Sequence, residues 1–265
     1  MTASASATRI ASIQTGRVQR PRRTLVYGTH GVGKSSFAAR FPSPIVIQTE
    51  EGLNGIAVDR FPLARRFADV LECLAALAEG EHEYRTVVVD SLDWLERLAW
   101  SSVCDKRGVS SIEEIGYGKG YVFALDLWKV VLDSLDILRN ERGMQVVLIA
   151  HAAVERFNNP ETDPYDRFVP RLQRLASACV QEWCDEVLFA TYRVKTRTVP
   201  AGGDRTRAQG VGRGERLLHT EERPGHVAKN RLFLPAELPL DFDAYAAAVA
   251  AAASSPSSSP SSKDA

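Results

Sequence analysis

The sequence predicts a three-layer α/β fold whose central sheet is mainly parallel and has an antiparallel extension near the C-terminus. Three observations predict it. Short β-branched runs alternate with longer segments of helical apolar periodicity, which is typical of a parallel sheet with helices on both faces. A glycine-rich phosphate-binding pattern at residues 28–35 lies between the first predicted strand and the first predicted helix. Late strands without intervening helices predict the antiparallel part.

The composition indicates one folded domain between two polar tails. Of the 265 residues, 45% are hydrophobic and 25% charged, enough to bury one full core. We predict a disordered basic arm over 1–22, a domain over 23–253 and a disordered Ser/Pro tail over 254–265. No apolar run approaches the ~20 residues needed to cross a bilayer, and no signal peptide is evident, so we expect a cytoplasmic protein without membrane contacts. Four cysteines in apolar contexts without C-x-x-C spacing are expected as reduced core thiols: Cys73, Cys104, Cys179 and Cys184.

The formal net charge is zero, but the charges are segregated along the chain. Residues 1–23 contain five arginines and no acid, and residues 193–231 contain ten Lys or Arg against four acids. A polyanion should meet these two regions first, although a solvated basic face would have the same composition.

Residues 28–35, GTHGVGKS, match the P-loop pattern G-x-x-x-x-G-K-[ST] at every defining position. Glycines let the backbone wrap around phosphate oxygens, and the N–H groups that begin the next helix point at the anion. Lys34 is expected to contact the β- and γ-phosphates, and the Ser35 hydroxyl to ligate Mg²⁺. The motif therefore predicts ATP, or another nucleoside triphosphate, with Mg²⁺. The expected nucleotide contacts are Gly28, Thr29, His30, Gly31, Val32, Gly33, Lys34, Ser35 and Ser36.

Two further predicted strands bring acids to the same region. Residues 45–47 form a β-branched run followed by Glu50 and Glu51, and residues 86–89 form a buried run that ends in Asp90. Open α/β sheets bind ligands at the carboxyl ends of their strands. Glu50 or Glu51 could therefore orient or deprotonate the water that attacks the γ-phosphate, while Asp90 is placed to hold Mg²⁺.

Apolar residues at helical spacing predict the helices that connect and follow these strands. They cover 67–79, a segment from Leu92 onward, 122–142, 172–184 and 241–253. In the helix that begins at Leu92, leucines occupy the apolar face, so Asp93 and Glu96 are expected at the surface.

His151 follows the buried run 145–150, whose strand we expect beside the strand of Asp90. A histidine at this position is either a structural residue or a sensor of the γ-phosphate, and the neighbouring strand favours the sensor. From 152 to 171 the chain is polar, which predicts a long loop.

Two segments combine aromatic rings with cations, as binders of single-stranded nucleic acid do. Residues 116–121 alternate glycines with Tyr117, Lys119 and Tyr121, although a glycine-rich start of a helix is an equally good interpretation. The second segment is the loop expected over 152–168, whose candidate DNA contacts are Arg156, Phe157 and Arg167.

The late part of the chain shows hairpin signals. Residues 186–194 are predicted as a strand, 198–214 as a glycine-rich hairpin tip and 216–220 as the returning partner. We expect a last strand over 226–231.

The order of these motifs resembles the RecA-like P-loop ATPases, and within them the phage nucleotide-binding proteins that act as RecA-related single-strand annealing recombinases. The resemblance covers roughly residues 23–239 and rests on segments 28–35, 47–50, 88–91, 151 and 229–231. In that family an acid matching Glu50 is the catalytic base, and the residue matching His151 senses the γ-phosphate. A Lys-Asn-Lys/Arg element matching Lys229 and Arg231 reaches the ATP of a neighbouring subunit.

The resemblance implies a DNA-dependent ATPase that binds single-stranded DNA as a homo-oligomer with ATP sites between subunits, and that promotes annealing or recombination. A single-strand binding protein is a further candidate partner, and a phage-encoded protein would act in the host cytoplasm. Long filaments are not implied, since filament-forming recombinases carry an extra N-terminal element. The alternatives are an ATP-switch adaptor or loader in phage DNA replication or packaging with little hydrolysis, and a P-loop kinase for a small metabolite.

Overall fold

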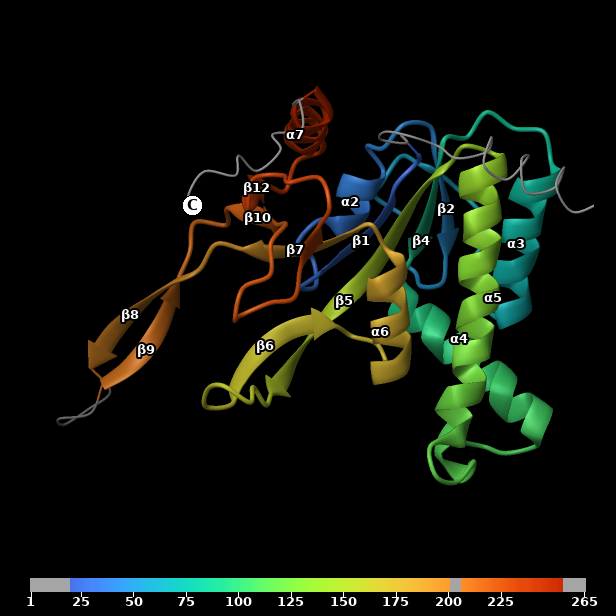
Figure 1. The fold of residues 1–265 in the computed structure, drawn as a ribbon, viewed down its shortest axis with the longest axis horizontal. Coiled ribbons are helices and arrows are strands. Elements are labelled where there is room, and N and C mark those ends of the chain that lie inside the picture. The colour runs from blue at the N-terminus through green and yellow to red at the C-terminus, as the bar shows by residue number, and fades with distance from the viewer. Residues whose placement is uncertain (1–19, 201–205, 255–265) are drawn as a thin grey trace, which may run out of the picture.

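The structure is a computed structural model that describes residues 20–200 and 206–254 (Figure 1). Most of the predicted arm and tail, residues 1–19 and 255–265, lie outside the described residues. The last part of the arm contacts the domain, where the Pro21 carbonyl accepts a hydrogen bond of 2.5 Å from Arg139 Nε. None of the helices in the described ranges is long and apolar enough to cross a membrane.

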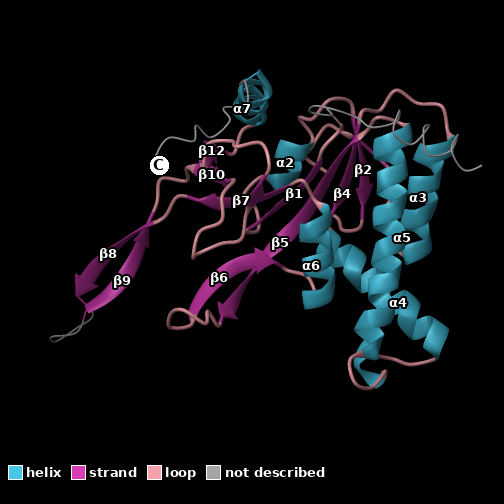
Figure 2. Cartoon of the chain, viewed as in Figure 1, coloured by secondary structure: helices cyan, strands magenta, loops and turns pink. Residues whose placement is uncertain are grey.

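Strands and helices alternate through most of the chain, and further strands follow (Figure 2). The elements are β1 (Arg23–Gly28), α2 (Lys34–Ala38), β2 (Pro44–Gln48), β3 (Asp59–Arg60), α3 (Phe67–Glu79), β4 (Thr86–Asp90), α4 (Leu92–Arg107), a 3-10 turn (Ile112–Glu114), α5 (Lys119–Glu141), β5 (Gln145–Phe157), β6 (Tyr165–Pro170), α6 (Arg174–Trp183), β7 (Glu186–Tyr192), β8 (Lys195–Pro200), β9 (Thr206–Val211), β10 (Arg216–His219), β11 (Lys229–Asn230), β12 (Glu237–Pro239) and α7 (Phe242–Ser254).

The main sheet has the strand order β12-β10-β7-β1-β5-β4-β2-β3. From β7 to β3 every neighbouring pair is parallel, whereas β10, β11 and β12 are antiparallel to their partners. Strand β5 lies between β1 and β4, so the strand of His151 does adjoin the strand of Asp90, as predicted. The α/β fold class, mainly parallel with an antiparallel extension, is therefore confirmed.

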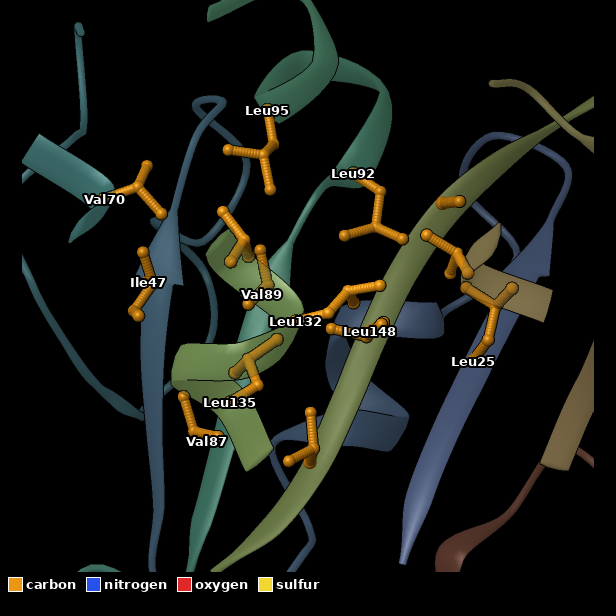
Figure 3. Packing of buried hydrophobic residues seen from close by; sticks show 14 of the residues in the cluster. Leu25, Ile47, Val70, Val87, Val89, Leu92, Leu95, Leu132, Leu135 and Leu148 are labelled. Carbon is orange, nitrogen blue, oxygen red and sulfur yellow. The ribbon is translucent and has the colours of Figure 1, made fainter. Parts of the chain in front are cut away.

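Two hydrophobic cores make the fold three-layered. On one face of the sheet, alternate strand residues pack against α3, α4, α5 and α6; Figure 3 shows Leu25, Ile47, Val89 and Leu148 in this layer, with Leu132 of α5 against them. On the other face, the intervening strand residues pack against Phe37 of α2 and residues of α7. Strands buried on both faces read as continuous apolar runs, which is why the sequence located them. The four cysteines are free thiols, two of them buried and two half-buried.

The prediction of a loop over 152–171 is wrong. Strand β5 continues through His151 to Phe157 and pairs antiparallel with β6, with Val154 opposite Phe168. This β5–β6 hairpin extends beyond the helix-covered part of the sheet (Figure 1). Its outer half has no buried face, so its sequence lacks the apolar pattern that identifies a strand. The last predicted strand, 226–231, is shorter than expected, because only β11 pairs with β7.

Candidate functional site

The P-loop begins where β1, in the middle of the sheet, ends at Gly28. Gly28 lies so close to β7 that an added Cβ would stand 2.0 Å from the Ala190 carbonyl oxygen, so a side chain has no room there. Gly33 precedes α2 with φ of 107°, a left-handed conformation that favours glycine. These constraints place the loop and the first N–H groups of α2 at the carboxyl edge of the sheet.

Lys34 is buried within this loop. Its ammonium donates hydrogen bonds to the carbonyl oxygens of Gly28 at 3.1 Å and Thr29 at 3.0 Å. Burial lowers the pKa of Lys34, although the charge of Asp90 opposes this effect. The buried Thr29 Oγ1 has no hydrogen-bond partner among the described residues. The loop therefore offers a cation and an unpaired hydroxyl, and these suit an anionic ligand.

Ser35 and Asp90 meet next to Lys34. The Ser35 hydroxyl donates to Asp90 Oδ2 at 2.6 Å. Burial raises the pKa of the Asp90 carboxyl, and the Ser35 hydrogen bond lowers it. The described residues contain no cluster of three or more His, Cys, Asp or Glu suited to a metal ion. Two protein oxygens fit Mg²⁺ and not a metal caged by protein, because Mg²⁺ usually completes its octahedron with phosphate oxygens and water.

The end of β2 positions Glu50. Just before it, Thr49 Oγ1 donates to the Ser91 carbonyl at 2.6 Å and accepts from the Ser91 N–H at 2.9 Å, which fixes β2 to the end of β4. Glu50 is half-buried, with Oε1 3.9 Å from His151 Nδ1, whereas Glu51 is exposed. Of the two candidate bases, only Glu50 lies within this group of polar side chains.

His151 is held by a carboxylate that the sequence analysis assigned to the surface. Asp93 is 4% exposed, and its Oδ2 lies 3.0 Å from His151 Nδ1. The His151 backbone N–H also donates to Asp93 Oδ1 at 3.2 Å, and Arg171 donates to Oδ2. A carboxylate only accepts hydrogen bonds, so Nδ1 carries a proton, and Nε2 remains for a ligand. The prediction that Asp93 faces solvent is wrong.

The hydrogen bonds determine the charge of Asp93. Burial alone would raise its pKa, but hydrogen bonds from His151 and Arg171 hold the pKa well below its usual range. Asp93 also lies in the first turn of α4, where the helix dipole favours a negative charge. This position, directly after the strand that ends in Asp90, is the signal that could have identified Asp93 from the sequence. Nothing comparable identified Arg171.

Glu96, one turn further along α4, is also buried, contrary to expectation. Both carboxylate oxygens lie 3.0 Å from the Gln173 backbone nitrogen, which begins α6. Burial raises the pKa of Glu96 to about 7, with the Asp93 charge as a smaller contribution in the same direction and the Gln173 hydrogen bond opposing it.

His30 connects the P-loop to His151. The two imidazole rings stack with centroids 4.0 Å apart and planes inclined by 25°. The nearby His151 is the main cause that lowers the pKa of the exposed His30. A rearrangement of the P-loop around a phosphate would therefore also shift the stacked ring of His151.

Lys229 and Arg231 do not lie at this site. Lys229 pairs opposite Val187 near the start of β7, whereas Gly28 pairs with Ala190 toward its other end. The Lys229 ammonium donates to three carbonyls around the end of α6, the shortest to Cys184 at 2.6 Å. Arg231 lies 3.3 Å from Asp185. Neither cation reaches the P-loop of its own chain.

Several of the residues proposed to contact DNA already interact with other residues of the chain. Tyr117 and Lys119 are exposed, but Tyr121 is half-buried against Trp100. In the β5–β6 hairpin, Arg167 lies over the Phe157 ring, 3.8 Å from its centroid. Arg167 also lies 3.3 Å from Glu222, and Arg156 lies 3.5 Å from Asp166.

The chain is similar to several known proteins. A family model described as an AAA domain, AAA_24, matches residues 20–232. The SPbeta prophage-derived uncharacterized protein YorG of Bacillus subtilis (strain 168) is 29% identical over 137 residues, which are 49% of this chain and 41% of YorG. The match thus spans less than half of that relative. The crystal structure of the RadB recombinase aligns with 79% of this chain and 86% of its own, at 14% identity and a TM-score of 0.43.

Proposed function

Because the chain belongs to the AAA domain family, whose model covers residues 20–232, we propose that it is an ATPase of phage type that binds single-stranded DNA as an oligomer and promotes annealing or recombination. The observation that carries the ATPase part is the convergence of Lys34, Asp90, Glu50 and His151 from four adjacent strands and their loops. The prophage origin of YorG supports the phage assignment.

Each of these residues has a role in hydrolysis. Lys34 gives up its hydrogen bonds to the loop carbonyls and donates to phosphate oxygens instead. The N–H groups at the start of α2 bind the same anion. Mg²⁺ held by Ser35 and Asp90 would neutralise developing charge on the phosphates. Glu50 accepts the proton of the attacking water or orients it. His151 donates from Nε2 to the γ-phosphate when protonated there, while Asp93 stabilises its positive charge.

In the proposed oligomer, Lys229 and Arg231 supply further cations to the ATP of a neighbouring subunit. Because Lys229 and Arg231 lie near the start of β7, away from the P-loop of their own chain, we assign them to the ATP of another subunit. Cations supplied in trans to a transferring phosphoryl group are worth ~10³ to 10⁵ in rate in other P-loop enzymes. Isolated subunits should therefore hydrolyse ATP slowly.

The β5–β6 hairpin supports a link between DNA and ATP. It continues the strand of His151 without interruption, and Arg171, directly after β6, contacts the Asp93 that holds His151. A DNA strand bound along this hairpin would act on both ends of the segment that positions the phosphate sensor.

The decisive experiment measures ATP turnover with and without single-stranded DNA at ~50 mM salt, where phosphate contacts are strongest. We expect stimulation by DNA, and loss of turnover in Lys34→Ala. If DNA neither binds nor stimulates, the DNA part of the proposal is wrong. If the wild type and Lys34→Ala hydrolyse ATP equally, the ATPase part is wrong.

An ATP-switch adaptor with little hydrolysis is the second candidate. It is favoured by the contacts of Lys229 and Arg231 within their own chain, which occupy the two cations that the first proposal assigns to a neighbouring ATP. Glu50→Gln separates the two functions. An enzyme should lose turnover while retaining nucleotide binding, whereas an adaptor should support its partner as well as the wild type does. Glu51→Gln is the matched control, because Glu51 is exposed.

A further inference from the structure

Strands β8 and β9, called the ribbon below, project from the domain (Figure 1). Within the described residues they form a separate two-stranded sheet and pair only with each other, from Lys195 opposite Val211 to Pro200 opposite Thr206. A two-stranded hairpin without a third strand or a covering helix is marginally stable in water. The ribbon is therefore the kind of element that a binding partner stabilises.

The two faces of the ribbon differ in chemistry. Because side chains alternate along a strand, Lys195 and Arg197 share one face with their opposite residues, the exposed Val211 and Gln209. Gln209 Oε1 accepts from Arg197 Nε at 3.1 Å and from Nη2 at 3.0 Å, which holds the guanidinium against this face. The other face carries Thr196, Thr198 and Gly210.

The charges at the base of the ribbon are already paired. Arg193 lies 2.9 Å from Glu215 and also contacts Glu237 of β12. Lys195 and Arg197 are exposed and have no carboxylate partner among the described residues. The ribbon therefore presents its positive charge outward, where an anion can reach it.

We propose that the ribbon binds double-stranded DNA, with its cationic face against the phosphates that border the major groove. The major groove admits a two-stranded β-ribbon as readily as an α-helix. This inference goes beyond the proposed function, because it concerns duplex DNA and a different element from those expected to bind single strands, and it does not depend on hydrolysis.

The base of the ribbon rests on the P-loop. Tyr192, at the end of β7, donates from its hydroxyl to the Gly31 carbonyl at 3.0 Å. Arg216, at the start of β10, donates to the Val32 carbonyl at 3.4 Å. Both strands that lead into and out of the ribbon thus contact neighbouring residues of the phosphate-binding loop. A shift of the ribbon on DNA would move these contacts, so duplex and nucleotide binding should be coupled.

The binding claim is tested with the full chain by fluorescence anisotropy on a labelled 30-base-pair duplex and on a single strand of the same length. The test variant is Lys195→Gln with Arg197→Gln. The control is Lys106→Gln with Lys129→Gln, two exposed residues on α4 and α5, away from the ribbon. We expect the test variant to bind the duplex roughly tenfold more weakly and the slope of log K against log salt to fall by about 1.8, as for two lost phosphate contacts.

Three outcomes would overturn the binding claim: unchanged duplex affinity, an equal loss in the control variant, or a loss confined to the single strand. Failure here is distinguishable from failure of the proposed function, because the test variant is also assayed for ATP turnover stimulated by single strands. We expect that stimulation to persist.

The coupling claim is tested with a non-hydrolysable ATP analogue. Its affinity is measured with and without saturating duplex, for the wild type and for Tyr192→Phe. Coupling between two sites commonly changes the affinity at one site by a factor of 5 or more when the other is filled. We expect such a ratio in the wild type and a ratio nearer to one in Tyr192→Phe. Equal ratios in the two proteins, or a wild-type ratio of one, would show that the P-loop contacts do not transmit DNA binding.

Discussion

At the scale of single residues, the candidate site depends on a buried carboxylate that does not itself meet the phosphate. Asp93 fixes the tautomer of His151 and pairs with Arg171, so one side chain positions the His151 ring and anchors the end of the β5–β6 hairpin. Removing one partner of a buried ion pair leaves an uncompensated charge, and this usually costs several kcal/mol. Asp93 is therefore a positioning residue with a structural contribution of its own.

Asp93→Asn should lower kcat for ATP by about 10- to 100-fold, because a hydrogen bond to a charged group contributes roughly 1.5 to 3 kcal/mol. Nucleotide affinity should change less, since Lys34 and the P-loop backbone remain. Steady-state kinetics and titration with an ATP analogue check the two values. Asp126→Asn, on the exposed side of α5, is the control. A kcat equal to that of the wild type would remove Asp93 from the mechanism.

Glu96 makes stability depend on pH near neutrality. Its pKa is about 7 in the folded chain against an ordinary value of 4.5, so the folded state binds more protons than the unfolded state between these values. Stability from this group is thus complete below about pH 4.5 and is lost as the pH rises through about 7. The difference is on the order of 3 kcal/mol.

Urea unfolding of the wild type and Glu96→Gln at pH 5 and pH 8 measures this effect. The wild type should lose more stability over this range than Glu96→Gln, which keeps an acceptor for the Gln173 N–H and does not titrate. Asp93 and the other carboxyls are common to both proteins, so the comparison isolates Glu96. Parallel pH dependences would contradict the prediction.

At the scale of elements, the close approach of β1 and β7 determines where the P-loop begins. The two strands are parallel neighbours, and Gly28 lies against the Ala190 carbonyl. The same β7 carries Tyr192 to the P-loop and pairs with β11 near its other end. One strand therefore organises the nucleotide loop, the base of the ribbon and the expected contact to another subunit.

Gly28→Ala should destabilise the domain by about 3 kcal/mol, because the new Cβ would stand 2.0 Å from the backbone oxygen of Ala190, in a strand that is paired on both sides. Gly52→Ala is the matched control, since nothing lies within 4 Å of a Cβ built there. Thermal unfolding followed by circular dichroism compares the two. Equal melting temperatures would show that β1 and β7 separate without cost.

At the scale of the whole molecule, the proposed ATP-site residues and the two proposed trans cations lie toward opposite ends of the parallel strands. Lys34, Asp90 and His151 lie toward the carboxyl ends of the strands, and Lys229 with Arg231 lies at the start of β7. If these two ends of the sheet meet between subunits, each ATP site is complete only in the oligomer. This arrangement predicts complementation between damaged subunits.

A mixture of Lys34→Ala and Arg231→Ala subunits should recover part of the ATP turnover that each variant lacks alone. Mixed interfaces contain some sites with an intact P-loop and an intact trans arginine. The double variant Lys34→Ala with Arg231→Ala, mixed with either single variant, provides the control. Turnover measured across mixing ratios should peak at intermediate composition; a straight line between the two variants would argue against shared sites.

Sequence patterns alone predicted the P-loop, the strands that lead to Glu50, Asp90 and His151, and the layered α/β fold. These features follow from local patterns: strands buried on both faces are continuous apolar runs, and phosphate binding needs glycines at fixed spacing. The buried partners that hold His151 became evident from the tertiary structure. Asp93 is 58 residues from His151 and 78 from Arg171, and the order of strands brings them together.

The same reason explains the wrong predictions. Residues 152–157 pair with 165–170, and the outer part of this hairpin is exposed, so no apolar periodicity distinguishes its strands from a polar loop. The contacts of Tyr192 and Arg216 with the P-loop, and the distance of Lys229 from it, depend on the position of β7 beside β1. Periodicity indicates which face of an element is buried, whereas strand order determines what that face contacts.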